Sequence, residues 1–152
     1  MYRNLKIGLF LGAVLALSGC KKDEAAAPSE KVIQFEKLAN EWHVTSVMHD
    51  DINAEGYDDF SVTFLGNSSD EVFLYKTDGR PENSPWPSSG TWNFGETIAN
   101  EIVRDANSAD ELKLNYSLSD NILTIEFDFN GVGYSNGKVN STTGHWVFSF
   151  DI

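Results

Sequence analysis

The residues of this 152-residue chain best suited to chemistry are a single cysteine and three histidines. Because Cys20 is the only cysteine, the sequence excludes a disulfide framework, a CxxC redox pair and a cysteine-ligated zinc site. His43, His49 and His145 have neither HxH nor HExxH spacing, which disfavours a histidine metal site, although His43 and His145 could share an outward face. The sequence also lacks a GxSxG nucleophile elbow and a phosphate-binding glycine loop. We therefore expect no catalytic residues, no cofactor and no enzymatic activity.

An acidic segment between positions 50 and 59 has part of the spacing of a calcium loop. Five of its residues fall at positions 1, 3, 5, 6 and 9 of an EF-hand-type loop: Asp51, Asn53, Glu55, Gly56 and Asp59. Val62 stands where the bidentate glutamate is needed, and the flanks have the pattern of strands rather than helices. The favoured interpretation is a solvated acidic hairpin loop, with a weak calcium site as the alternative.

Two aromatic residues in polar loops are candidates for ligand contact. Trp86 lies in the segment 80–87 (RPENSPWP), where flanking prolines could present its face to an apolar ligand or a sugar ring with little entropy to lose. The alternative, which we favour, is that Trp86 folds back and plugs one end of the domain. Tyr134, in a glycine- and asparagine-rich loop, is the second candidate.

The first twenty residues have the pattern of a secretory leader. Arg3 and Lys6 precede an apolar run over residues 7–17, about the length of a secretory h-region (roughly 7–15 residues) and shorter than a membrane span (about 20). The run ends in Leu17-Ser18-Gly19-Cys20. This sequence resembles the lipobox of bacterial lipoproteins. The resemblance implies that residues 1–19 are removed and that Cys20 carries diacylglycerol and a further acyl chain such as palmitate, which anchor the protein to a membrane.

Charged residues follow the cysteine: Lys22, Asp23 and Glu24. They resemble the export signal of Bacteroidetes-type surface lipoproteins, which implies display at the cell surface on the outer membrane. A solvated tether on a periplasm-facing protein is the alternative. Loss of Arg3 and Lys6 with the leader would change the formal charge from −12 to about −14. Such an acidic chain is a poor partner for nucleic acid, and the sequence identifies no protein partner.

The remainder of the chain is predicted to form a tether and one domain. Residues 20–34 read as the lipidated cysteine and a flexible tether, and residues 35–152 as a single domain. Val32, Phe35 and Leu38 have helical spacing, which predicts a short helix before the first strand.

From Trp42 onward the apolar residues recur with a period of two, which predicts about eight short strands. The strand segments are 41–49, 60–64, 71–76, 90–94, 101–104, 112–118, 123–129 and 146–152. In the first of them the expected inward row is Trp42, Val44 and Met48, and in the last it is Trp146, Phe148, Phe150 and Ile152. Sequential antiparallel pairing with the first strand closing on the eighth gives an all-β, up-and-down barrel. An open β-sandwich is the alternative.

Three tryptophan motifs accompany this pattern: the first-strand Trp42, the central sequence GTWNF at 90–94 and the closing sequence WVF at 146–148. Together they resemble the lipocalin-like lipoproteins of Bacteroidetes. The resemblance implies a small antiparallel barrel that binds a small apolar or amphipathic ligand at one mouth. The tryptophans and the loop tyrosine are then the candidate contacts: Trp86, Tyr134, Trp42, Trp92 and Trp146.

The chain also departs from the lipocalin pattern. Asn40 stands where lipocalins have the glycine of Gly-x-Trp, and no lysine or arginine follows Lys138 to pack against the first tryptophan. The strand segments are short, so the barrel could be filled by its own side chains. The alternative function is therefore a protein- or glycan-interaction module on the cell surface, with a filled barrel and no small-molecule pocket.

Overall fold

The computed structural model describes residues 27–134 and 142–152. The predicted leader, the cleavage motif ending at Cys20 and the export-type residues Lys22, Asp23 and Glu24 lie outside the described residues. Within the described part of the chain, no helix is both long enough and apolar enough to cross a membrane.

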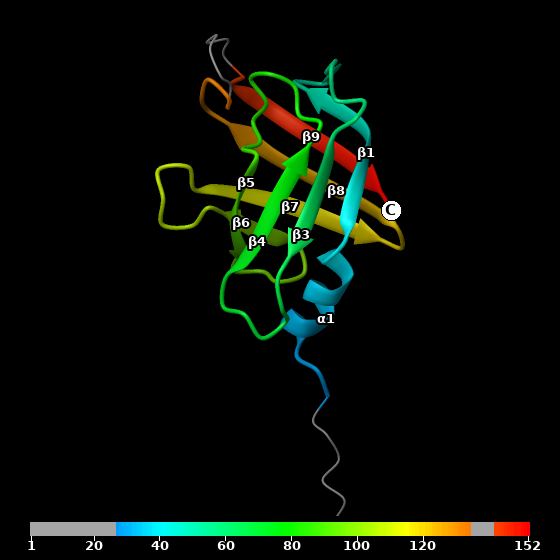
Figure 1. Ribbon diagram of the computed structural model, residues 1–152, viewed down its shortest axis with the longest axis vertical. Coiled ribbons are helices and arrows are strands. Elements are labelled where there is room, and N and C mark those ends of the chain that lie inside the picture. Colours follow the sequence, from blue (N-terminus) through cyan, green and yellow to red (C-terminus); the bar gives the residue numbers. More distant parts are fainter. Residues whose placement is uncertain (1–26, 135–141) are drawn as a thin grey trace, which may run out of the picture.

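The described residues form one helix and a closed antiparallel barrel, which confirms the predicted fold (Figure 1). The elements are α1 (Glu30–Leu38), β1 (Glu41–His49), β2 (Ile52–Asn53), β3 (Ser61–Leu65), β4 (Phe73–Asp78), β5 (Ser89–Phe94), β6 (Glu101–Arg104), β7 (Leu112–Ser119), β8 (Ile122–Phe129) and β9 (Gly144–Asp151). Each barrel strand pairs with the next, from β1 through β3 to β9, and β1 also pairs with β9. The short β2 adds only to the end of β1. Closure leaves no long unpaired edge on the barrel.

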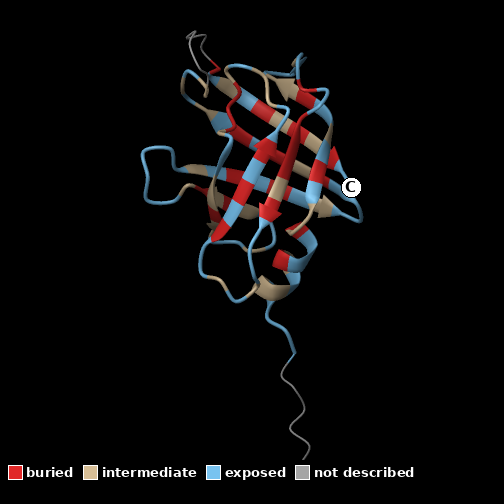
Figure 2. Cartoon of the chain, in the orientation of Figure 1, coloured by how far each residue is buried: buried red, intermediate tan, exposed pale blue. Residues whose placement is uncertain are grey.

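The hairpin of β8 and β9 shows how period-two sequence becomes a filled interior. In its register Leu123 lies opposite Phe150 and Ile125 opposite Phe148, and all four side chains are buried. The residues between them point outward, and Figure 2 shows this alternation along the strands. Burial of each such side chain contributes about 1.5–3 kcal/mol to folding. Ile152, which the pattern placed inward, is instead exposed, because β9 ends at Asp151.

The first strand departs from strict alternation. The pairing of β1 with β9 shifts register between Val44 and Ser46, so Thr45 is an extra residue in the ladder. A bulge of this kind moves the following residues to the opposite face. The predicted inward position of Met48 is therefore wrong, and Val47 is the buried residue in its place.

The helix closes one end of the barrel, called here the helix end. Ser29 begins α1 by accepting a hydrogen bond from the Val32 amide at 3.4 Å. Phe35 and Leu38 face the barrel and are buried, as their spacing predicted. The Phe35 ring stacks on Phe73 with centroids 4.6 Å apart. The helix begins at Glu30, so residues 30–34, expected in the tether, are part of the folded domain.

Candidate functional site

The end of the barrel opposite α1 is formed by longer connections, and we call it the loop end (Figure 1). These connections are the segments 50–60, 79–88, 105–111 and 130–134. Loops carried on a rigid scaffold are the usual place for binding residues. The loop end is therefore where a site is to be sought.

Trp86 fills the barrel at the loop end. Its side chain is fully buried, and its ring makes edge-on contacts with Tyr75, Phe127 and Phe148 at centroid distances of 5.8, 6.0 and 6.1 Å. Its amide donates to Ser84 Oγ at 3.2 Å, and the following residue, Pro87, accepts a hydrogen bond from the Thr77 hydroxyl at 2.7 Å. The stiff segment predicted from the prolines thus inserts its tryptophan as a plug.

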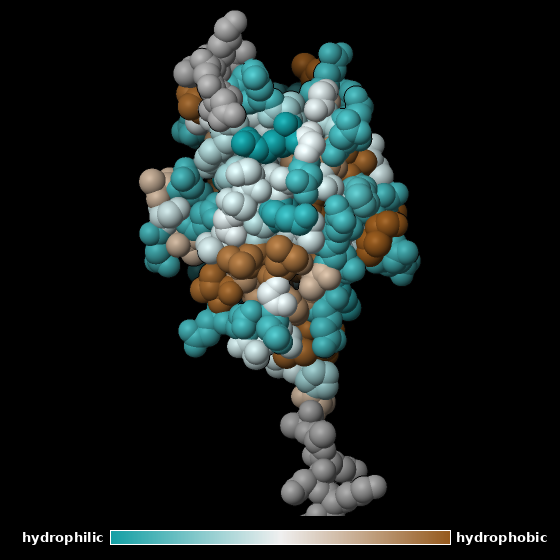
Figure 3. Space-filling view, viewed as in Figure 1, coloured by the Kyte–Doolittle hydropathy of each residue, from teal (hydrophilic) through white to brown (hydrophobic). Residues whose placement is uncertain are grey.

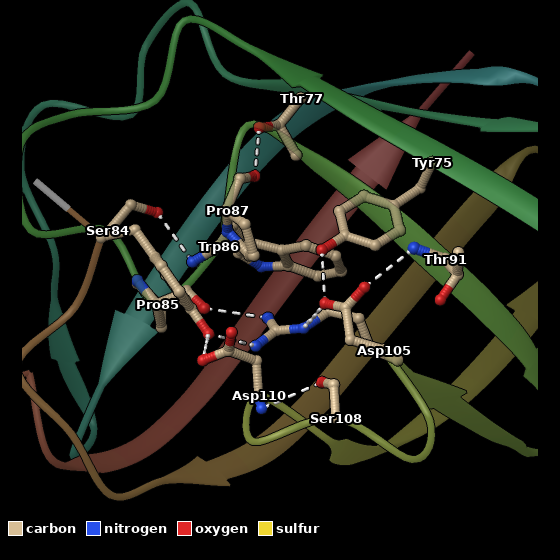
Figure 4. Close-up of polar contacts among 12 residues, drawn as sticks. Tyr75, Thr77, Ser84, Pro85, Trp86, Pro87, Thr91, Asp105, Ser108 and Asp110 are labelled. Carbon is tan, nitrogen blue, oxygen red and sulfur yellow. Dashed lines mark hydrogen bonds and ion pairs between the residues drawn. The ribbon is translucent and has the colours of Figure 1, made fainter.

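An arginine is buried beneath this plug. Arg104 is 1% exposed, and its guanidinium lies 5.5 Å from the centroid of the Trp86 ring. Nη1 donates to the Pro85 carbonyl at 2.9 Å, and Nε lies 3.3 Å from Asp105 Oδ2 without the alignment of a hydrogen bond. The charge is thus compensated, which an arginine in this environment requires. Figure 4 labels two of these partners, Pro85 and Asp105.

Asp105 connects the arginine to the neighbouring strands. Its Oδ2 accepts from the Tyr75 hydroxyl at 2.9 Å, and its Oδ1 accepts from the Thr91 amide at 2.8 Å (Figure 4). Gly90 makes room for this group, because a Cβ there would collide with the Asp105 carboxylate and the Tyr75 ring. Burial raises the pKa of Tyr75 well above its usual value, so it is a hydrogen-bond donor at neutral pH.

Arg104 also forms part of the wall of a pocket of about 380 Å³ at the loop end. We call this pocket the mouth pocket. The pocket lies between the β6–β7 turn and the segment that follows β8. Its chemistry comes mainly from six residues: Arg104, Asp110, Glu111, Asp128, Phe129 and Tyr134. It therefore combines one guanidinium, three carboxylates and two aromatic rings.

Tyr134 links the pocket to the plug. Arg104 Nη2 donates to the Tyr134 hydroxyl at 3.4 Å, and that hydroxyl donates to Asp110 Oδ1 at 3.0 Å. Burial is the main cause of a raised pKa for Tyr134, which keeps this donor protonated. Its amide donates to the Ser84 carbonyl at 2.9 Å, and its own carbonyl accepts from Arg80 Nη1 at 2.6 Å. Movement of the pocket wall and of the Trp86 segment would therefore be coupled.

The other three tryptophans have structural positions. Trp42, Trp92 and Trp146 are buried, and each indole N–H donates to a backbone carbonyl. The acceptors are Leu38, Leu74 and Thr142, at 2.9, 3.0 and 2.9 Å. Of the residues predicted to contact a ligand, only Tyr134 lines the mouth pocket. Trp86 does not line it, but its ring packs against Arg104, which does.

The structure does not gather the calcium candidates into one cluster. Asp50 and Asp51 form the tight turn between β1 and β2, with φ of 49° and 64°. Asn53 pairs with Met48, which holds it in the sheet. Glu55 and Asp59 are exposed further along the loop. Among the described residues, no group of three or more His, Cys, Asp or Glu side chains could hold a metal ion.

The histidines are arranged differently from the expectation. His43 lies opposite Asp151, far along the β1–β9 pair from His145, so these two do not meet. His49 is instead the histidine near that end, where its ring stacks on Trp146 at 4.1 Å. His145 Nδ1 lies 2.9 Å from Asp128 Oδ1 at the rim of the pocket.

Of the main pocket residues, the sequence predicted only Tyr134 as a site residue; it did not predict Arg104 or the rest of the pocket wall. One signal was available: Ile102 and Arg104 are alternate residues of one strand, so an inward Ile102 implies an inward arginine. Comparisons with known proteins add no neighbour, since no family model, curated protein or solved structure matches the chain. The site is thus defined by its geometry, in which donors, acceptors and aromatic faces converge at the mouth of a filled antiparallel barrel.

Proposed function

We propose that this protein is a lipid-anchored, lipocalin-like binding protein that holds a small amphipathic ligand in the mouth pocket of its barrel. The observation that carries the proposal is the pocket of about 380 Å³ with the buried Arg104 in its wall. This volume falls within the roughly 300–1,000 Å³ that small-molecule sites occupy. The barrel interior is filled by side chains, so the ligand binds at the mouth and not along the barrel axis.

The pocket favours a ligand with hydrogen-bond donors and an apolar face. Asp110, Glu111 and Asp128 supply carboxylate acceptors, which suit hydroxyl or ammonium groups. Phe129 and Tyr134, with ring centroids 6.2 Å apart, supply aromatic surface against which a sugar ring or aliphatic group can pack. The buried guanidinium acts on the pocket through Tyr134, to whose hydroxyl it donates. We expect a hydroxylated amphipathic molecule, such as the end of a glycan or a glycolipid.

Thermal melting of the mature chain against oligosaccharides, glycolipids, fatty acids and sterol- and haem-like molecules tests this function. A ligand present at 100 times its dissociation constant should add about 2.7 kcal/mol to the free energy of unfolding. The substitution Asp110→Asn should reduce that gain, because it removes a charged acceptor from the pocket. Glu55→Gln, an exposed carboxylate at the same end but outside the pocket, is the matched control. A gain unaffected by Asp110→Asn would place the ligand elsewhere, and no gain with any compound would refute a small-molecule site.

The second candidate is an interaction module for a protein or a larger glycan. The filled barrel favours it, together with Ile52 and Val132, which are 72% and 53% exposed at the loop end. Isolated exposed apolar residues are common, but Val132 belongs to the pocket wall and Ile52 lies outside it at the same end, so together they can extend a binding surface beyond the pocket. Binding to a glycan or protein partner that is lost in Ile52→Asp, outside the pocket, but unchanged in Asp110→Asn would favour this candidate.

The anchor and the location are part of the same proposal. The resemblance of residues 17–20 to a lipobox supports acylation of Cys20, and Lys22, Asp23 and Glu24 support export to the cell surface. Mass spectrometry of the membrane-extracted protein should show acyl chains on Cys20 and none in Cys20→Ala. Replacement of Asp23 and Glu24 by alanine should then protect the protein from protease added to intact cells. Unchanged protease sensitivity would refute the export signal alone.

A further inference from the structure

An apolar patch lies on the outside of the barrel at the helix end. Leu65 and Leu74 are opposite one another in the β3–β4 pair and are 40% and 54% exposed. Val72, two residues before Leu74, is 55% exposed, and Ile33 on α1 is 41% exposed. Figure 3 shows hydrophobic surface over this end of β3 and β4 and again on the part of the molecule below it. We call these four residues the apolar patch.

The outward position of the patch follows from the strand alternation. In β4 the buried residues are Phe73, Tyr75 and Thr77, so Leu74, and Val72 just before the strand, face solvent. Further along the same face the outward residues are Lys76 and Asp78, which are polar. On the outward face of β4, the apolar side chain is thus at the end of the strand that lies nearest the helix.

The helix is fixed beside this patch. Phe35 of α1 stacks on Phe73, and Lys31 Nζ donates to the Asp70 carbonyl at 2.7 Å in the β3–β4 turn. Lys31 also lies 5.0 Å from the Phe73 ring centroid. The start of α1, the β3–β4 turn and the adjoining ends of β3 and β4 are therefore held together, and they carry all four patch residues.

The chain that precedes α1 places this surface near the proposed lipid anchor. Residues 21–29 separate Cys20 from Glu30, and nine residues reach at most about 32 Å even when fully extended. A short flexible linker maintains an effective concentration on the order of millimolar between the two things it joins. A patch with little affinity of its own would therefore be held against the bilayer that contains the acyl chains.

We propose that the apolar patch rests on the surface of the lipid bilayer that holds Cys20, so that the mouth pocket at the loop end faces away from the membrane. This inference rests on the lipid anchor of the proposed function. Contact through apolar side chains fits the strongly acidic chain, for which electrostatic attraction to anionic lipid is unfavourable. The same charge opposes association of a second copy.

Hydroxyl-radical footprinting of the mature chain tests the orientation. Because Cys20 is the only cysteine, it can be coupled to a maleimide lipid in phosphatidylcholine vesicles, and the same chain with Cys20 capped is the free reference. We expect oxidation of Leu65, Val72 and Leu74 to fall severalfold on the vesicles. Oxidation of Ile52 and Val132 at the loop end should stay unchanged. In the double variant Leu65→Asn/Leu74→Asn the protection of Val72 should disappear, whereas the matched variant Ile52→Asn should keep it.

Two other results of the footprinting experiment would overturn the proposal. Equal oxidation of Leu74 on vesicles and in the free chain would show that the patch does not touch lipid. Protection in the free chain that increases with protein concentration would assign the patch to a second copy. Chemical coupling makes the footprint independent of acylation in cells. A failure of acylation or ligand binding would therefore appear in the separate tests above and not in this one.

Discussion

At the helix end the barrel is closed by the apolar contacts of Phe35 and Leu38, whereas at the loop end Trp86 closes it above a buried ion pair. Both closures exclude water from the core, but three of the four buried side-chain polar atoms without a hydrogen bond in the described residues lie at the loop end, the fourth being Thr63 Oγ1 on β3. The indole nitrogen of Trp86, Nε of Arg104 and Oδ1 of Asn83 are of this kind. Unsatisfied polar groups lower the free energy of unfolding. The comparison indicates that the helix end serves the fold and that the loop end carries features the fold alone does not require.

The largest expected effect breaks the polar closure. Arg104→Met should lower the free energy of unfolding by about 3–5 kcal/mol, because it leaves the Asp105 carboxylate partly buried without its cation. Urea unfolding measures the change. The double variant Arg104→Met/Asp105→Asn should recover part of the loss, since it removes the uncompensated charge. An equal loss in the single and double variants would show that packing, and not charge, holds this end.

The matching change at the helix end should be somewhat smaller. Phe35→Ala should lower the free energy of unfolding by about 3 kcal/mol, at the low end for a buried phenylalanine, because α1 can shift to fill part of the space. Urea unfolding followed by tryptophan fluorescence reports it through Trp92, whose ring is 6.2 Å from Phe35. Ligand binding at the loop end should stay unchanged at temperatures where the variant is folded. Loss of binding in the folded variant would show that the two ends are coupled.

Alkaline pH should weaken both ends. Burial raises the pKa of Tyr57 at the loop end and of Tyr116, whose hydroxyl donates to the Ile98 carbonyl near the helix end, to about 12 in each case. A tyrosine with a raised folded pKa stabilises the protein fully below pH 10 and loses that contribution between pH 10 and 12. As the pH rises through that window, the loss of each tyrosine's contribution should lower the free energy of unfolding by up to about 1.4 kcal/mol per pH unit. Urea unfolding from pH 9 to 12 measures the slope, which Tyr57→Phe and Tyr116→Phe should each reduce.

The smallest expected effect concerns the cap of α1. Ser29→Ala should lower the free energy of unfolding by about 1 kcal/mol, because it removes the acceptor for the Val32 amide. Thermal unfolding measures it, and Ser29→Asp should retain most of the difference as an alternative cap. The footprint of the apolar patch should be unaffected when α1 stays docked. A larger loss would show that the start of the helix contributes more than its cap.

Much of the barrel could be predicted because each strand carries its own alternation. Leu123, Ile125 and Phe127 have the period that a half-buried strand requires, and the structure buries all three. Thr45 could not be recognised as a bulge, because the shift is set by the pairing with β9 and not by the residues of β1. The pocket was equally hidden, since it forms where Asp110 and Tyr134 approach across a turn and a loop that are distant in sequence.

The pairing of β1 with β9 also determines how the chain must fold. It joins residues such as His43 and Asp151, which lie at opposite ends of the domain sequence. Contacts of such large sequence separation form late, because loop closure costs entropy before the pairing compensates for it. The edges of β1 and β8 therefore stay open until the last residues of the chain arrive. A nascent chain that lacks β9 cannot complete the barrel, so closure is the last step of folding whatever the order in which the other hairpins form.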